Sequence, residues 1–172
     1  MHVLEIALAV RTQALVSLWR GERRATTVSY DETWSVTMSD FTLAASDDME
    51  AVFFGSRKRV RAPLGVESFG MQVIDLPLGA TQYPRHDHAH DSQEEVFLVL
   101  WGSGEIEIDG ERHPLTPEVM VRVGLESKRK IWPGEEGIRL LVLGGRPGHI
   151  YEPPEISKLG MPDPGLASVA HS

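Results

Sequence analysis

Short runs of strand-forming residues, separated by glycine and proline turns, fill the middle of this 172-residue chain. Strands are expected at residues 67–76, 95–101, 105–108, 119–123 and 138–143. Asp109-Gly110 follows the third of these, and this residue pair favours a tight hairpin because both positions tolerate a positive φ. No long helical period occurs between residues 55 and 145. The pattern therefore predicts an all-β sandwich or barrel.

The flanking segments differ from this region. Four apolar residues between positions 4 and 19 fall near helical spacing, which predicts a short amphipathic helix. Residues 1–54 are expected to form an N-terminal extension, and those before Met38 could be an addition to the native protein because Met38 is itself a plausible start. Residues 55–150 would form the barrel, and the proline-containing residues 151–172 an irregular tail.

Composition narrows the possible functions. The formal net charge of -8 argues against nucleic acid as a partner, since binding to phosphates needs a clustered positive surface. The one basic run, residues 57–61, is expected to be a solvated strand edge. The absence of cysteine removes disulfides, thiolate metal sites and a cysteine nucleophile, and it fits the cytoplasm. No stretch approaches the roughly 20 apolar residues of a membrane span, so no membrane partner is expected.

The strongest chemical signal is a histidine cluster before the second expected strand. Three of the seven histidines alternate there, as His86, His88 and His90, and Glu95 follows. Alternate residues of a strand face the same side, so two imidazoles could bind one ion and Glu95 could complete the site. Such a donor set suits a divalent transition metal: iron, manganese, nickel, copper or zinc. Polar neighbours that could orient the imidazoles are Asp87, Asp91 and Gln93.

This stretch resembles the first motif of the cupin superfamily, G-x5-H-x-H-x3,4-E-x6-G. Glu95, six residues and Gly102 match its second half, and two alignments remain open for the first half. The pair His88 and His90 leaves the usual four residues before Glu95. The pair His86 and His88 leaves six, but it nearly restores the spacing from Gly79, and its context is similar to that of small bacterial cupins. We favour His86, His88 and Glu95, with His90 as a near neighbour.

The second cupin motif, which normally supplies a fourth ligand, is not retained. It should fall across residues 118–133, where every fixed position differs and Arg129 stands in place of the histidine. Two roles are open for Arg129. It could be a pocket cation that binds an anionic substrate group, or it could pair with Glu95 and hold a metal-free barrel together.

The resemblance covers about residues 55–145 and implies a single cupin double-stranded β-helix, or jelly roll. It also implies a metal-dependent enzyme of dioxygenase or isomerase/lyase type that acts on a small oxygenated or carboxylated metabolite. Arg129 and Glu95 would then take part in catalysis, and Phe97 and Trp101 would form the apolar pocket wall. The alternative is a non-catalytic barrel that binds or senses a small ligand without metal. Small cupins commonly pair, so a homodimer is expected.

Overall fold

The structure is a computed structural model and describes residues 36–38 and 41–169. The helix expected between residues 4 and 19, and most of the segment before Met38, lie outside the described residues. Two short strands, β1 (Val36–Met38) and β2 (Phe41–Leu43), pair with each other as a separate antiparallel sheet. None of the described helices is long and apolar enough to cross a membrane.

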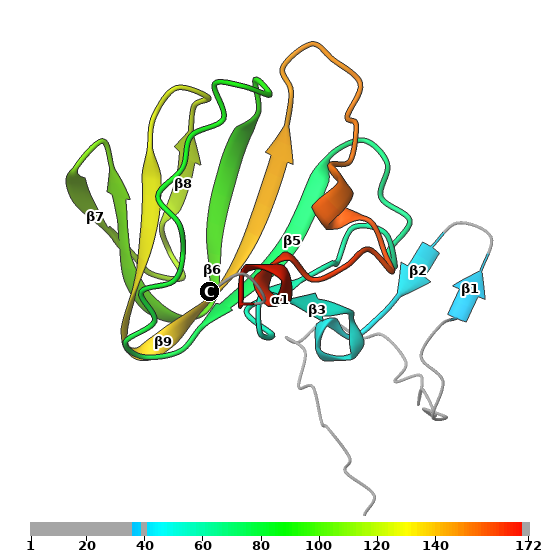
Figure 1. Cartoon of the computed structure of the whole chain (residues 1–172), viewed down its shortest axis with the longest axis horizontal. Coiled ribbons are helices and arrows are strands. Elements are labelled where there is room, and N and C mark those ends of the chain that lie inside the picture. The colour runs from blue at the N-terminus through cyan, green and yellow to red at the C-terminus, as the bar shows by residue number, and fades with distance from the viewer. Residues whose placement is uncertain (1–35, 39–40, 170–172) are drawn as a thin grey trace, which may run out of the picture. The chain divides into compact units, whose positions relative to one another are not determined.

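Seven further strands form one antiparallel sheet, which confirms the all-β prediction (Figure 1). Their spatial order is β3 (Ala51–Val52), β4 (Arg57–Lys58), β5 (Gly70–Leu76), β9 (Arg129–Gly145), β6 (Glu94–Ile108) and β7 (Glu111–Leu115), while β8 (Met120–Val123) also pairs with β6. The sheet begins at Ala51, slightly before the expected barrel boundary.

The two longest strands, β6 and β9, pair along most of their length and bend together. β6 unites two strands that the sequence predicted separately, and β9 begins well before residue 138. The register between them shifts at Val99/Trp101 and again at Gly102/Gly104. Such bulges increase local twist and bend a strand. Each long strand therefore passes around the barrel rather than ending at its corner.

The β6–β7 hairpin is the one that the sequence predicted. Ile108 pairs with Glu111, and the two residues between them, Asp109 and Gly110, have φ values of 50° and 97°. Positive φ at both central positions is the requirement of the turn that matches the twist of paired strands.

Alternating residues of the strands fill the barrel interior. Five of its side chains are completely buried, namely Phe97, Ile106, Leu115, Ile131 and Leu140. Each such side chain contributes roughly 1.5–3 kcal/mol relative to an exposed one. Phe97 is thus a core residue.

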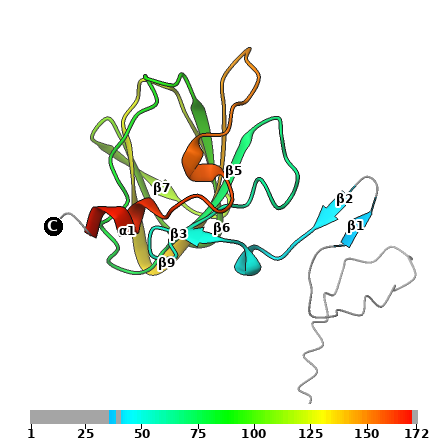
Figure 2. The ribbon, with the colours of Figure 1, turned by 45° about the vertical axis from the view of Figure 1, so that its right-hand side comes forward.

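The segment after the barrel is less irregular than expected. It contains the 3-10 helix η2 (Glu155–Ser157) and the helix α1 (Pro164–Val169), and η1 (Ser46–Asp48) precedes β3. Figure 1 and Figure 2 both place η2 close to β5. Buried Arg59 holds this segment: its guanidinium donates to the carbonyl oxygens of Ile156 and Met161, both at 2.8 Å.

The expectation that residues 57–61 form a solvated edge is wrong. Lys58 and Arg59 are both buried, and each pairs with carboxylates: Lys58 with Asp47 and Asp75, and Arg59 with Glu50. The run was misassigned because its acidic partners lie on other segments of the chain, where sequence spacing gives no sign of them.

Gly102→Ala should destabilise the barrel more than a matched glycine substitution. Gly102 has φ +73°, and an added Cβ would overlap the carbonyl oxygen of Gly137. We expect a loss of about 3 kcal/mol or more in the free energy of unfolding. Gly110→Ala, at φ +97° but with open space around it, is the control and should cost about 1 kcal/mol. Equal losses in urea denaturation would contradict the close approach of β6 and β9.

Candidate metal centre

The structure brings together His86, His88 and Glu95, which come from two different segments. Glu95 lies near the start of β6, opposite Val123 of β8 and Gly144 of β9. The histidines lie on the preceding loop. His86 forms a two-way backbone bridge with Arg129, at 3.1 and 2.8 Å, and the amide of His88 donates to the carbonyl oxygen of Leu125 at 2.8 Å. These backbone bonds dock the loop onto the barrel.

The histidines do not lie on a strand, contrary to the expectation from their alternation. Only His86 makes a strand-like bridge, whereas His90 lies in a turn. The side chain of His90 is 77% exposed, and its ring stacks on that of His88 at 6.2 Å between centroids. His90, expected among the ligands, is therefore outside the cluster, and the structure favours the pair His86 and His88.

The donor atoms of the three residues face one another. His86 Nε2 lies 3.7 Å from Glu95 Oε2, and His88 Nε2 lies 3.5 Å from Glu95 Oε1. One ligand atom from each residue falls within 4.8 Å of the others. Two ligands of one ion at about 2.1 Å in tetrahedral geometry are about 3.4 Å apart. The spacing is therefore close to that of atoms that share a metal ion.

Hydrogen bonds on the far side of each imidazole fix its protonation. His86 Nδ1 contacts the carbonyl oxygen of Pro84 at 3.1 Å, and His88 Nδ1 contacts Asp91 Oδ1 at 3.0 Å. Both partners are acceptors, so each Nδ1 carries a proton, and in the neutral ring Nε2 presents a lone pair.

Two of the converging atoms make no hydrogen bond within the described part of the chain. His88 Nε2 and Glu95 Oε2 are buried and have no hydrogen-bond partner among the described residues. Lone pairs that face one another are stabilised by a cation between them, either a proton on an imidazole or a metal ion. Two imidazoles and a carboxylate are ligands that suit a divalent transition metal. The residues present therefore fit a metal ion.

Arg129 lies behind the cluster and is 0% exposed. Its Nε lies 3.3 Å from Glu95 Oε2, and its terminal nitrogens donate to the carbonyl oxygens of His86 and Gly124 at 3.4 and 3.3 Å. Arg129 does not line the cavity beside the cluster. The expectation that it is a pocket cation is therefore wrong, because no surface of its guanidinium faces the ligand space, and pairing with Glu95 is the arrangement present.

The charges of the site follow from this packing. Burial raises the pKa of Glu95, but the nearby imidazoles of His86 and His88 outweigh it and lower that pKa to about 2. Burial lowers the pKa of His88, while Glu95 and Asp91 outweigh it, so that the net shift is upward. Glu95 is thus an anion throughout the neutral range, as a metal ligand must be.

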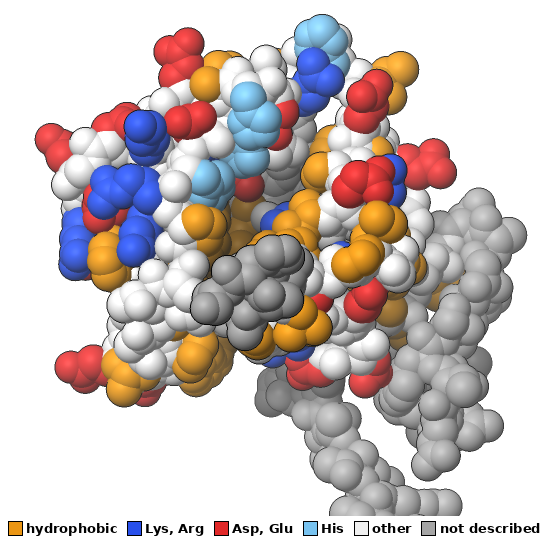
Figure 3. Space-filling view, viewed as in Figure 1, with side chains coloured by type: hydrophobic (Ala, Val, Ile, Leu, Met, Phe, Trp, Pro, Cys, Tyr) orange, Lys and Arg blue, Asp and Glu red, His pale blue; other side chains and the backbone are white. Residues whose placement is uncertain are grey.

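The cluster lies at the side of a cavity of 680 Å³, within the usual range for small-molecule sites. Histidine side chains border a hollow in which hydrophobic side chains are visible (Figure 3). The apolar lining consists mainly of Phe53, Phe54, Met71, Ile74, Leu76 and Val142. Phe97 and Trp101 are not part of it: Phe97 belongs to the core, and Trp101 is 57% exposed.

Sequence analysis missed the lining that comes from outside the central strands. Phe53, Phe54 and Arg57 come from the β3–β4 hairpin, and Tyr151 and Ile156 come from the C-terminal segment. The one local signal was Phe53-Phe54-Gly55, since two aromatic residues rarely occupy a turn without a surface to contact. Both adopt positive φ, at 54° and 58°.

Comparison with known proteins agrees with this architecture. No protein-family model and no curated protein matches the chain. Among solved structures, a cupin protein from Bacteroides fragilis superposes with a TM-score of 0.53 and 23% identity, over 68% of this chain and 93% of that one. The chain has the cupin fold. A sugar phosphate isomerase of the cupin superfamily from Silicibacter pomeroyi is also similar, with a TM-score of 0.49 and 22% identity, over 58% of this chain and 73% of that chain.

Arg129→Met should destabilise the protein strongly. The substitution leaves the buried carboxylate of Glu95 without its guanidinium and should cost about 3 kcal/mol in the free energy of unfolding. Arg122→Met is the matched control, because Arg122 pairs with Glu94 at the surface and exposed pairs contribute only about 0–1 kcal/mol. Urea denaturation of metal-free protein measures both. Similar small losses would show that the Arg129 pair is not structural.

Stability at low pH should depend on Glu95. Its pKa is depressed in the folded protein, so its ionised form contributes stability that is present above the ordinary value of 4.5 and is lost as pH falls toward about 2. Glu95→Gln should therefore be less stable than the parent chain at pH 6, with the difference shrinking by pH 3. Unfolding of EDTA-treated protein at several pH values measures this, with exposed Glu111→Gln as control. A difference that stays constant would contradict the assignment.

Proposed function

We propose that this protein is a metal-dependent cupin enzyme that acts on a small oxygenated or carboxylated molecule in its cavity, by dioxygenase- or isomerase/lyase-type chemistry. The observation that carries the proposal is the convergence of His86 Nε2, His88 Nε2 and the Glu95 carboxylate at the cavity wall, where His88 Nε2 and Glu95 Oε2 make no hydrogen bond to the described residues. Iron, manganese, nickel, copper or zinc held there would supply Lewis acidity or oxygen activation.

Neighbouring residues orient the side chains of His86, His88 and Glu95 for binding a metal ion. Pro84 and Asp91 accept hydrogen bonds from the Nδ1 atoms, which holds the rings and keeps each Nε2 lone pair toward Glu95. Such contacts orient ligand histidines and raise their basicity. Arg129 contacts Glu95 from the side away from the cavity and helps to hold its carboxylate in place. Arg129 is therefore a positioning residue, and Glu95 acts directly as a ligand.

The missing fourth ligand affects whether the site would suit a catalytic or a structural metal ion. Arginine has no free lone pair and stays protonated, so Arg129 cannot take the place of the missing histidine. Three protein ligands leave the remaining coordination positions to substrate and water, which is the arrangement of a catalytic rather than a structural metal site.

A non-catalytic barrel that binds or senses a small ligand is the second candidate. It is favoured by one observation, the contact of the Arg129 guanidinium with Glu95, because this cation already compensates the carboxylate charge. A homodimer in the cytoplasm remains the predicted setting for either function.

Metal content separates the two candidates. Full-length protein without a tag, purified without chelator, should contain about one transition metal per chain by elemental analysis. His86→Ala and His88→Ala should each remove most of it, since either change leaves only two ligands. His90→Ala is the matched control and should retain the metal, because His90 lies outside the cluster.

Zinc titration of EDTA-treated protein provides the affinity, and the two ligand variants should bind at least tenfold more weakly. If the parent chain remains without metal after incubation with iron, manganese, nickel, copper and zinc, the non-catalytic function replaces the enzymatic one. A loss of metal in His90→Ala as large as in His86→Ala would instead contradict the assigned ligand set.

A further inference from the structure

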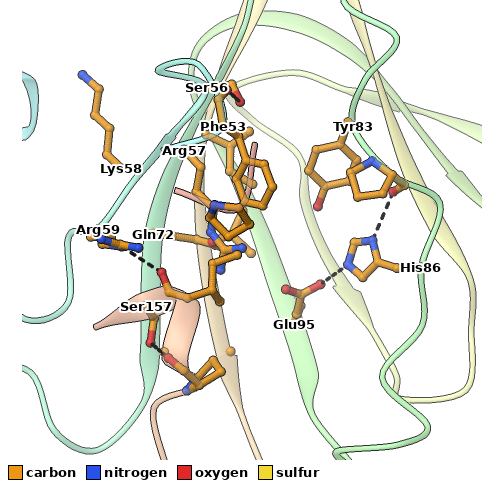
Figure 4. Close-up of a pocket in the computed structure, with 18 of the residues that line it drawn as sticks. Phe53, Ser56, Arg57, Lys58, Arg59, Gln72, Tyr83, His86, Glu95 and Ser157 are labelled. Carbon is orange, nitrogen blue, oxygen red and sulfur yellow. Dashed lines mark hydrogen bonds and ion pairs between the residues drawn. The ribbon is translucent and has the colours of Figure 1, made fainter. Parts of the chain in front are cut away.

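One arginine of the cavity lining takes no part in the metal cluster. Arg57 lies on β4 directly opposite Ile74 of β5, and residues paired in this way share one face of a sheet. Ile74 belongs to the buried barrel core, so Arg57 is directed to the same interior side. Figure 4 shows Arg57 on one side of the cavity and His86 with Glu95 on the other.

Arg57 differs from the basic residues beside it. Lys58 pairs with Asp47 and Asp75, Arg59 pairs with Glu50, and Arg61 donates to the carbonyl oxygen of Val66 at 2.7 Å. The guanidinium of Arg57 makes neither a hydrogen bond nor an ion pair with any residue in the described part of the chain. The charged groups of these neighbours thus stabilise the fold through ion pairs and hydrogen bonds, whereas the guanidinium of Arg57 makes no such contact with any described residue.

The carboxylates that line the cavity are already compensated. Asp91 contacts His88, and Glu95 contacts Arg129 and both ligand histidines. The guanidinium of Arg57 is therefore left without a carboxylate of the described residues in contact with it, in a mainly apolar cavity. Burial lowers the pKa of Arg57, which expresses the cost of removing this charge from water. Arginine nevertheless stays protonated in proteins, so the charge persists and favours an anion.

We propose that Arg57 binds the carboxylate of a small organic acid in the cavity, whose other end reaches the His86, His88 and Glu95 cluster. The inference rests on the proposed function, in which the cavity holds the substrate, and it names the substrate class. A carboxylate is favoured over a phosphate because one guanidinium matches a single negative charge with two parallel hydrogen bonds. A dianion would leave one charge uncompensated against the apolar lining.

A second group of the lining is suited to the same anion. Tyr83 lines the cavity, and burial raises the pKa of its phenol. The hydroxyl therefore keeps its proton and can donate a hydrogen bond to an oxygen of the ligand.

Calorimetric titration of the full-length chain with a matched set of probes tests the proposal. Hexanoate, hexanamide and hexyl phosphate have the same apolar chain and differ in the head group. Hexanoate should bind at least tenfold more tightly than hexanamide. Arg57→Met should lower the affinity for hexanoate at least tenfold and leave that for hexanamide unchanged, while Arg57→Lys should fall between, because lysine keeps the charge without the planar fork.

A control substitution and a stability measurement separate binding from folding. Arg112→Met removes an exposed arginine that pairs with Glu105 outside the cavity lining, and it should leave hexanoate binding unchanged. Arg57→Met should raise the melting temperature of the ligand-free protein by about 2 °C or more, because it removes a desolvated charge that has no partner. A lower melting temperature in this variant would show that Arg57 has a structural role and would overturn the proposal.

Three binding results would also overturn it: unchanged hexanoate affinity in Arg57→Met, no preference of the parent chain for hexanoate over hexanamide, or tighter binding of hexyl phosphate. Titrations on both EDTA-treated and zinc-loaded protein distinguish this inference from the proposed function. A parent chain that holds its full metal content but shows no preference for hexanoate counts against the inference about Arg57 alone. Carboxylate binding by a chain that takes up no metal counts against the enzymatic function alone.

Discussion

The buried carboxylate of Glu95 is the constraint on which the rest of the site depends. It is 4% exposed, and burying an isolated anion in a protein interior is very unfavourable unless cations or donors surround it. Arg129 faces it from behind, and His86 and His88 face it from the cavity side. The backbone of the histidine loop bonds to Arg129 itself, so the groups that compensate the charge also fix the loop. One interaction thus joins the start of β9, β6 and the loop.

Arg129 occupies a position where the sequence comparison with the cupin motif expects a histidine, and the barrel forms with the arginine in place. A histidine there would add a neutral donor, whereas Arg129 places a permanent positive charge 3.3 Å from the Glu95 carboxylate. The ligand set is therefore preorganised by the protein, with three donors facing the cavity. The same contact is compatible with both candidate functions. Arg129 holds the Glu95 carboxylate in position for a metal ion, and it also compensates part of the carboxylate charge when no metal is bound.

The basic residues on and directly after β4 point in different directions and therefore make different contacts. Arg57 is directed to the barrel interior with Ile74, while Lys58 pairs in register with Val73 and forms ion pairs with Asp47 and Asp75. Arg59 anchors the C-terminal segment that contributes Ile156 to the cavity. Adjacent cations thus make different contacts, because successive side chains of an extended chain point to different sides.

The sequence by itself determined the barrel and most of the candidate metal site. Alternating strands, the Asp109-Gly110 hairpin and the spacing from His86 and His88 to Glu95 and Gly102 are local patterns, and backbone geometry converts them directly into structure. The tertiary structure alone decided that His90 lies outside the cluster, that Arg129 is buried behind Glu95, and that Arg57 rather than Trp101 lines the cavity. These outcomes depend on contacts between residues that are distant in the chain, where burial and charge compensation are properties of the packed barrel and not of any single segment.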